Sequence, residues 1–361
     1  MTKKNNSPWL LYGAYGFTGR LLVAEAVRRG HRPVLAGRDA ARLDELGAQY
    51  DLDWLALDLD YAPRLHQAVE RFDLVFHAAG PFIHTSESMI RACLAGGAHY
   101  IDITGEINVF ENTFSHDAEA RTRGVALMSG GGFDIVPTDC LARYVADQMP
   151  DATHLETAFY GMADLTSGTV KSALANLDKA PGGSVVRRNN RLVSQPLGKG
   201  SRKVRFSDGR EHHVSPFPWG DLVAAAHTTG IPNITCYIAL PRVPGMRWTS
   251  SLLTRVLATS PARRVANRLA DWAFSGPDEE AQRTARTYLY ARALNGAGQS
   301  AEAWLETGEV YRFTALAGIQ LVERMLSDNP AGAVSPAGAF GADFVLGIEE
   351  TRRFDNIPER A

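Results

Sequence analysis

Short apolar segments alternate with segments of helical spacing through the first 130 residues of the chain. An apolar run of about four residues, bounded by turn residues, is typical of a strand buried on both faces. Parallel strands need helical crossovers between them, so the alternation predicts an α/β fold with a doubly wound parallel sheet. The predicted strands cover residues 9–12, 33–36, 54–57, 74–76, 100–103 and 125–128, and the predicted helices cover 18–29, 40–49, 63–71, 87–94 and 109–123.

The segment after the first predicted strand reads GAYGFTG, with glycines at positions 13, 16 and 19. Ligands of doubly wound sheets lie beyond the carboxyl ends of the strands, where this segment falls. Gly13 permits a tight turn, Gly16 lets the backbone approach a pyrophosphate, and Gly19 allows close packing of helix on strand. The first N–H groups of the following helix favour phosphate. We therefore predict a Rossmann-type dinucleotide site made by Gly13, Tyr15, Gly16, Phe17, Thr18 and Gly19.

The end of the second predicted strand indicates which dinucleotide binds. Sites for NAD usually place an acidic residue there, whereas this chain has Ala36, Gly37 and Arg38. Because the guanidinium of Arg38 can fork onto a 2′-phosphate, NADP (as NADPH) is the expected cofactor, and a solvated surface charge is the alternative role. Asp39 is expected to cap the next helix. Asp58, after the third strand, either lies at the adenine edge or caps a helix.

Small residues follow the fourth and fifth predicted strands, where the nicotinamide half of the cofactor passes close to the backbone. The residues assigned to the cofactor there are Ala79, Gly80, Pro81, Thr104 and Gly105. Three glycines at 130–132 follow the sixth strand. They indicate either backbone packed against a ligand or a hinge between domains.

In hydride transfer the cofactor does the chemistry, and the protein positions the cofactor and substrate and supplies at most one proton donor. Glu106 and Asp134 are catalytic candidates by their location after the fifth and sixth strands, and Lys171 is a candidate to bind a carboxylate or donate a proton. A structural cap or ion pair is the alternative role for each. The sequence lacks HExxH, GxSxG, clustered Cys and His, and a tyrosine followed by lysine four positions later. We therefore expect no metal site, and an epimerase-like enzyme is disfavoured.

The motifs GAYGFTG, LAGR, HAAGPF, YIDITGE and GGFDIVPTD occur in this order over residues 8 to about 140. In this order they resemble the saccharopine dehydrogenase-like oxidoreductase family, including its trans-acting enoyl reductase branch. The segment TSGTVKSAL at 166–174 also resembles that family's entry into its substrate domain. The resemblance implies a Rossmann domain, a second α+β domain, and a C-terminal return to the first domain. The GxxGxxG spacing is closer to the enoyl reductase branch, which argues against saccharopine as substrate.

The second half of the chain changes pattern. Strands are predicted at 155–160, 184–188, 203–206 and 234–240, a hairpin at 287–294 and 301–306, and a helix at 311–326. This pattern predicts an α+β domain with a mixed or antiparallel sheet. With the return that the resemblance implies, the expected domains are residues 1–132 and 328–361 (Rossmann) and residues 133–327 (substrate or dimerisation).

Residues 246–274 read as a basic amphipathic helix pair broken near Pro261. They are interpreted as helices packed on their own domain. The alternatives are a lid over an apolar substrate, a homodimer contact, or contact with a membrane surface.

Composition narrows the class of protein. A net charge of -2 argues against a nucleic-acid partner. Three scattered cysteines, no signal-peptide apolar region, and no run of about 18 apolar residues predict a cytoplasmic protein without a transmembrane segment. The expected function is an NADP-dependent oxidoreductase acting on a C=C, C=O or C=N bond of a small or lipid-like substrate. The alternative is a non-catalytic NADP-binding redox sensor or scaffold.

Overall fold

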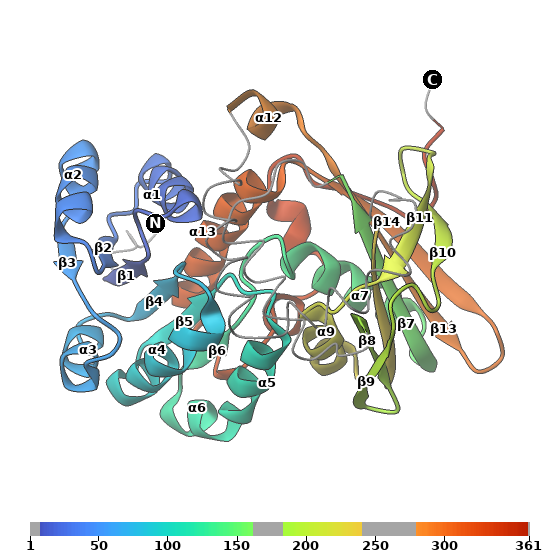
Figure 1. Cartoon of the computed structure of the whole chain (residues 1–361), viewed down its shortest axis with the longest axis horizontal. Coiled ribbons are helices and arrows are strands. Elements are labelled where there is room, and N and C mark those ends of the chain that lie inside the picture. Colours follow the sequence, from blue (N-terminus) through green and yellow to red (C-terminus); the bar gives the residue numbers. More distant parts are fainter. Residues whose placement is uncertain (1–7, 162–182, 240–278, 360–361) are drawn as a thin grey trace. The chain divides into compact units, whose positions relative to one another are not determined.

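The computed structural model describes residues 8–161, 183–239 and 279–359 (Figure 1). These residues form two compact units. The first holds the described residues up to Thr104, then Val109–Phe133 and Tyr311–Val334. The second holds Gly105–Asn108, the described residues from Asp134 to Val310, and those from Ser335 onward. Lys171 and the segments 166–174 and 246–274 lie outside the described residues, as does residue 240 of the strand predicted at 234–240.

The first unit contains a seven-stranded sheet of order β15-β6-β5-β4-β1-β2-β3, in which each strand pair is parallel. The strand order reverses between β1 and β4, the position at which doubly wound sheets bind ligands. This confirms the predicted Rossmann-type sheet. Its strands are β1 (Trp9–Tyr12), β2 (Val34–Gly37), β3 (Trp54–Ala56), β4 (Leu74–His77), β5 (His99–Asp102), β6 (Ala126–Met128) and β15 (Gly332–Ala333).

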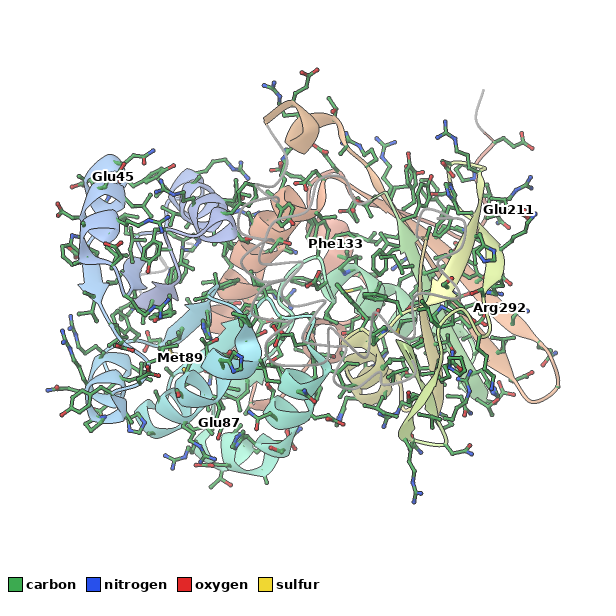
Figure 2. All side chains as sticks on the ribbon, viewed as in Figure 1. Glu45, Glu87, Met89, Phe133, Glu211 and Arg292 are labelled. Carbon is green, nitrogen blue, oxygen red and sulfur yellow. The ribbon has the colours of Figure 1, made fainter. Side chains whose placement is uncertain are left out.

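Helices connect these strands, and their apolar sides complete the core. Met89 of α4 is fully buried while Glu87 of the same helix is partly exposed, which distinguishes the two faces of that helix (Figure 2). The helices are α1 (Phe17–Arg28), α2 (Ala40–Tyr50), α3 (Ala62–Val69), α4 (Phe82–Gly96), α5 (Ile107–Ser115), α6 (Asp117–Arg123) and α13 (Val310–Asp328).

Two helix predictions differ from the structure. The helix predicted from residue 87 begins at Phe82. Phe82 and Ser86 are buried, but the other residues of the first turns are mostly polar, so the sequence shows no clear apolar spacing there. The helix predicted over 109–123 is two helices, α5 and α6, separated at His116.

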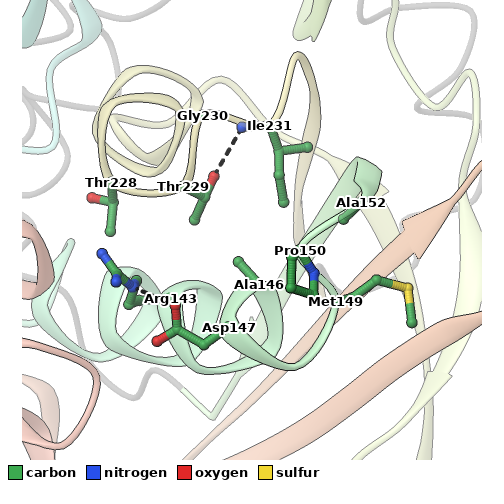
Figure 3. Close-up of a pocket in the computed structure, with 10 residues that line it drawn as sticks. All are labelled: Arg143, Ala146, Asp147, Met149, Pro150, Ala152, Thr228, Thr229, Gly230 and Ile231. Carbon is green, nitrogen blue, oxygen red and sulfur yellow. Dashed lines mark hydrogen bonds and ion pairs between the residues drawn. The ribbon is translucent and has the colours of Figure 1, made fainter.

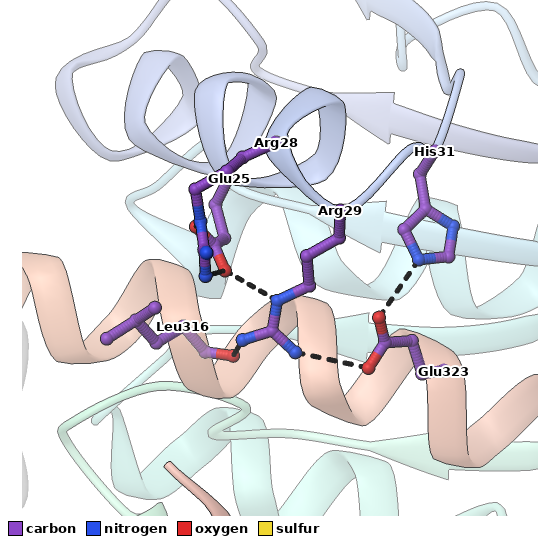
Figure 4. Close-up of polar contacts among 6 residues, drawn as sticks. All are labelled: Glu25, Arg28, Arg29, His31, Leu316 and Glu323. Atoms are coloured by element: carbon purple, nitrogen blue, oxygen red, sulfur yellow. Dashed lines mark hydrogen bonds and ion pairs between the residues drawn. The ribbon is translucent and has the colours of Figure 1, made fainter. Parts of the chain in front are cut away.

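Helix α13 belongs to the first unit, whereas the sequence assigned residues 311–326 to the second domain. Arg29, at the end of α1, donates to Glu25, to Glu323 at 3.1 Å and to the backbone oxygen of Leu316 (Figure 4). Nε2 of His31 lies 3.1 Å from Glu323. These contacts depend on residues far apart in sequence, so the helical spacing of α13 alone does not indicate which sheet it covers.

The second unit contains a mixed sheet of order β10-β11-β12-β7-β13-β14-β16, with β8 pairing β12 and β9 pairing β8. The β12–β7 pair is parallel and the other pairs are antiparallel, as the mixed-sheet prediction requires. The strands are β7 (Ala152–Tyr160), β8 (Gly183–Arg188), β9 (Arg191–Pro196), β10 (Arg202–Arg205), β11 (Glu211–Pro216), β12 (Asn233–Ile238), β13 (Thr287–Asn295), β14 (Ser300–Thr307) and β16 (Arg352–Phe354).

The predicted hairpin is β13–β14, and the ion pair of Arg292 with Glu302 at 3.1 Å links its strands (Figure 2 labels Arg292).

The helices of the second unit include α7 (Val136–Gln148), α9 (Asp221–Thr229), α12 (Glu279–Thr284) and α14 (Pro336–Phe340). Of the C-terminal segment expected to return to the first domain, β15 pairs with β6, whereas β16 pairs with β14. None of the helices in the described part of the chain is long and apolar enough to span a membrane.

Candidate functional site

The loop between β1 and α1 has the backbone that its glycines predict. Gly13 has φ +86°, and a Cβ there would lie 2.8 Å from the carbonyl carbon of Ala78. A Cβ on Gly19 would lie 2.7 Å from the carbonyl oxygen of Ala14. Real Cβ atoms do not approach so closely, so both positions require glycine. The loop is thereby held against the end of β4, and α1 against the end of β1.

The N-terminus of α1 is open to a phosphate. Gly16 is the N-cap residue, and in the described part of the chain no side chain caps this helix. Among the described residues, the only atom within 4 Å of a Cβ on Gly16 would be the oxygen of Gly13, at 3.3 Å. Unpaired N–H groups at the start of a helix, beside backbone without side chains, fit a pyrophosphate. Phe17 and Thr18 begin this helix.

Three arginines contact Tyr15 of the glycine loop, beside the end of β2. The hydroxyl of Tyr15 accepts the backbone N–H of Arg38 at 3.2 Å, and the Arg38 side chain is exposed. The guanidinium of Arg42 lies 4.4 Å from the centre of the Tyr15 ring and donates to the Tyr15 backbone oxygen at 3.1 Å. Arg20 donates to the same oxygen at 3.3 Å. Arg20 and Arg42 were not predicted from the sequence, although both occupy the first turns of helices that follow predicted strand ends.

Two acidic residues near this end make local hydrogen bonds. Asp39 caps α2 by accepting from the N–H groups of Ala41 and Arg42 at 3.1 and 3.2 Å, which confirms the predicted cap. Asp58 accepts the N–H of Asp60 at 3.1 Å in a turn before α3, whose N-cap residue is Tyr61. A role of Asp58 at the adenine edge stays a prediction.

The residues predicted to line the nicotinamide half differ in accessibility. Gly80 is exposed, and Ala79 and Pro81 are partly exposed at the carboxyl end of β4. Thr104 is fully buried after β5, and its N–H donates to Asp102 at 2.9 Å. Because the whole residue is enclosed by protein and its N–H is bonded to Asp102, its assignment to the cofactor stays a prediction.

The three glycines after β6 have neighbours within the first unit. Gly130 has φ +80°. A Cβ on Gly131 would lie 2.5 Å from the side chain of Ile101, and one on Gly132 would lie 2.7 Å from that of Thr314. The glycines therefore allow this segment to pack against β5 and α13, so their presence does not require a ligand.

The structure brings Glu106 and Asp134 together in the second unit. Glu106 is buried and Asp134 is partly exposed. Burial, and then the negative charge of Glu106, raise the pKa of Asp134 to about 7. A Cβ on Gly105 would lie 2.9 Å from Oδ2 of Asp134, so the glycine makes room for this carboxyl. A carboxyl with a pKa near neutrality is suited to general acid catalysis.

A buried carboxylate that the sequence did not indicate lies at the start of α9. Asp221 is fully buried and accepts the hydroxyl of Thr138 at 2.7 Å and that of Thr157 at 3.4 Å. Burial raises its pKa well above the usual value, and the charge of Asp139 adds to this effect. An acid with a raised pKa in the folded state destabilises the fold progressively as pH rises above the pKa of the unfolded chain.

Asp221→Asn is therefore expected to stabilise the protein at pH 8 by about 1–3 kcal/mol, with the gain shrinking toward pH 4. The amide keeps one acceptor for Thr138 and carries no charge to bury. Urea unfolding across this pH range measures the effect, and Asp147→Asn, at an exposed pair with Arg143, is the matched control. A less stable Asp221→Asn protein at pH 8 contradicts this account.

A polar cavity of about 350 Å³ lies between the carboxyl-terminal ends of α7 and α9 (Figure 3). Arg143 on its wall donates to Asp147 at 2.7 Å, and Thr229 accepts the N–H of Ile231 at 3.2 Å. None of the predicted site residues that the structure describes lines it. Among the described residues, no group of three or more His, Cys, Asp or Glu side chains is arranged to hold a metal ion.

The glycine loop, the open helix N-terminus and the parallel sheet define the first unit as a dinucleotide-binding Rossmann domain. Residues 9–128 match the family model described as the saccharopine dehydrogenase NADP binding domain. This part of the chain is therefore an NADP-binding domain similar to that of saccharopine dehydrogenase. The match confirms both the resemblance found in the motifs and the expected cofactor.

Similar proteins extend the comparison. A Mycobacterium tuberculosis (strain ATCC 25618 / H37Rv) protein, provisionally named a trans-acting enoyl reductase, is 27% identical over 283 residues, 73% of this chain and 62% of that protein. The trans-acting enoyl reductase of Mycobacterium leprae (strain TN) is 32% identical over 139 residues, 36% of this chain and 33% of that protein. The chain thus spans less than two thirds of the length of these relatives.

A solved structure shows the same fold over the chain. Apo saccharopine dehydrogenase (L-Glu forming) from Saccharomyces cerevisiae superposes with a TM-score of 0.61, covering 97% of this chain and 99% of that one. Its sequence is 11% identical, so the likeness concerns the fold alone.

Proposed function

We propose that this protein is an NADPH-dependent oxidoreductase that reduces a double bond of a small molecule. The observation that carries the proposal is Asp134, an acid whose pKa of about 7 suits proton donation, in a chain with an NADP-binding domain. Acids with a pKa near neutrality occur more often at catalytic sites than elsewhere, so this feature favours turnover over the sensor or scaffold alternative.

Each step of the reaction has a proposed residue. NADPH, when bound, supplies a hydride from its nicotinamide ring. The glycine loop binds the pyrophosphate, and Arg38 with Arg42 binds the 2′-phosphate. Asp134 gives its proton to the second atom of the double bond, so that hydride and proton together add two hydrogens. Burial, and then the charge of Glu106, keep that proton on Asp134 near neutral pH.

The substrate class follows from the names of the relatives. Because two of them are named trans-acting enoyl reductases, we propose a C=C bond next to a carbonyl group, in a lipid-like chain, as the bond reduced. Location in the cytoplasm and a substrate-binding role of the second unit belong to the same proposal. The predicted homodimer or membrane contact depends on residues 246–274, which lie outside the described residues.

The test has two stages. Isothermal titration with NADPH and NADH is expected to show tighter binding of NADPH. A panel of enoyl thioesters, ketones and imines is then screened by the loss of NADPH absorbance, and turnover with the enoyl thioesters is expected. Failure to bind either nucleotide overturns the proposal, and binding without turnover on any compound favours the sensor alternative.

A further inference from the structure

The carboxylate of Asp102, at the end of β5, was not among the residues predicted to bind or react. It is fully buried in the first unit. Its Oδ1 accepts the backbone N–H of Thr104 at 2.9 Å and that of Gly130 at 3.0 Å. Its Oδ2 accepts the hydroxyl of Tyr100 at 2.9 Å and that of Ser129 at 2.8 Å. One side chain thus receives four hydrogen bonds from two neighbouring strand ends.

This arrangement suits the ionised form of Asp102. A carboxylate only accepts hydrogen bonds, whereas a protonated carboxyl must also donate one. Burial raises the pKa of Asp102 to about 6, although the four hydrogen bonds act to lower it. Among the described residues, no charged side chain contributes to this shift.

The titratable groups that face Asp102 are Tyr100 on its own strand and, beyond it, His77 of β4. Nδ1 of His77 lies 3.2 Å from the Tyr100 hydroxyl. Burial lowers the pKa of His77 to about 3, so this imidazole is neutral at the pH values at which Asp102 titrates. Ser129 and, next to it, Thr113 of α5 supply hydroxyls, which carry no charge.

The peptide groups held by Asp102 belong to the segments that follow β5 and β6, the first of which was predicted from the sequence to meet the cofactor. Thr104 precedes Gly105, and both are assigned to the cofactor. Gly130 begins the segment after β6, and the backbone oxygen of Asp102 also accepts the N–H of Gly131 at 2.5 Å. Without the carboxylate, the N–H groups of Thr104 and Gly130 would be buried without these acceptors, which costs free energy and favours another backbone arrangement.

We propose that Asp102 is a positioning residue of the cofactor site, whose carboxylate fixes the backbone after β5 and β6 in the arrangement that binds the nicotinamide half of NADPH. This inference rests on the proposed function. Asp102 acts through peptide groups of the protein and needs no contact with the cofactor.

The test compares NADPH affinity of the wild type and Asp102→Asn by titration calorimetry between pH 5 and pH 8. The amide keeps one oxygen for the two backbone N–H groups and cannot ionise. The ratio of the variant's Kd to the wild-type Kd is expected to be about tenfold at pH 8. It is expected to approach one at pH 5, where Asp102 of the wild type is protonated. Titration of the cofactor's own phosphate cancels in this ratio.

Asp328→Asn, an exposed carboxylate on α13 paired with Arg324, is the matched control and should give a ratio of one at every pH. A ratio for Asp102→Asn that does not change with pH overturns the inference, whether it is one or large. If Asp102→Asn does not fold, Ser129→Ala replaces it, because it removes one donor and keeps the carboxylate. This variant is expected to raise the pH below which affinity falls, and an unmoved pH contradicts the inference. A wild type that binds no NADPH overturns the proposed function as well.

Discussion

Replacing Asp134 with asparagine is expected to lower the turnover of NADPH-dependent reduction by about 10²–10⁴-fold while NADPH affinity stays near the wild-type value. The amide has nearly the same size and can occupy the space that Gly105 leaves, but it has no acidic proton to give. The chain holds Asp134 near neutral pKa through burial and the charge of Glu106, so the proton is available at working pH.

The pH dependence distinguishes a proton donor from a structural carboxyl. Wild-type turnover is expected to fall as pH rises through about 7, because Asp134 then loses its proton. The residual rate of Asp134→Asn should lack this decline. Glu106→Gln, which removes the neighbouring charge, should move the decline to lower pH. Stopped-flow or steady-state NADPH absorbance measures these profiles, with Asp147→Asn as control. An unchanged rate in Asp134→Asn removes it from the mechanism.

Much of the first unit was predictable because its signals are local. Four-residue apolar strands, the glycines of the loop and the cap residue Asp39 each depend on neighbours within a few positions. The loop conformation followed from Gly13 and Gly19, since no other residue fits there. The same holds for the β13–β14 hairpin, whose turn is rich in glycine.

The features that were missed depend on distant contacts. Strand β9 carries mostly exposed residues and has little apolar alternation, so its pairing with β8 left no clear pattern. The place of α13 depends on Arg29 and Glu323, and that of Asp221 on the hydroxyls of Thr138 and Thr157. In the sequence, Asp102 looks like an ordinary turn residue at a strand end. Its role depends on four donors that only the folded sheet brings together. Arg42 gained significance only from its position on Tyr15.

Removing the side chains of Arg38 and Arg42 together is expected to weaken NADPH binding by on the order of a hundredfold and to leave NADH binding nearly unchanged. The two nucleotides differ by the 2′-phosphate, which these guanidinium groups are proposed to hold. Arg42 already lies on the Tyr15 ring and donates to its backbone oxygen, so little side-chain freedom remains to be lost when the phosphate binds.

Single variants separate the contribution of Arg38, whose side chain is exposed, from that of Arg42, which lies on the Tyr15 ring. Arg38→Ala removes an exposed side chain, whereas Tyr15→Leu keeps Arg42 but removes the ring on which it lies. If preorganisation matters, Tyr15→Leu should weaken NADPH binding by nearly as much as Arg42→Ala. Arg32→Ala, at an exposed pair with Asp51 before β2, is the control. Equal losses for NADPH and NADH in the double variant would show that these arginines shape the loop and do not read the phosphate, because only a phosphate contact separates the two nucleotides.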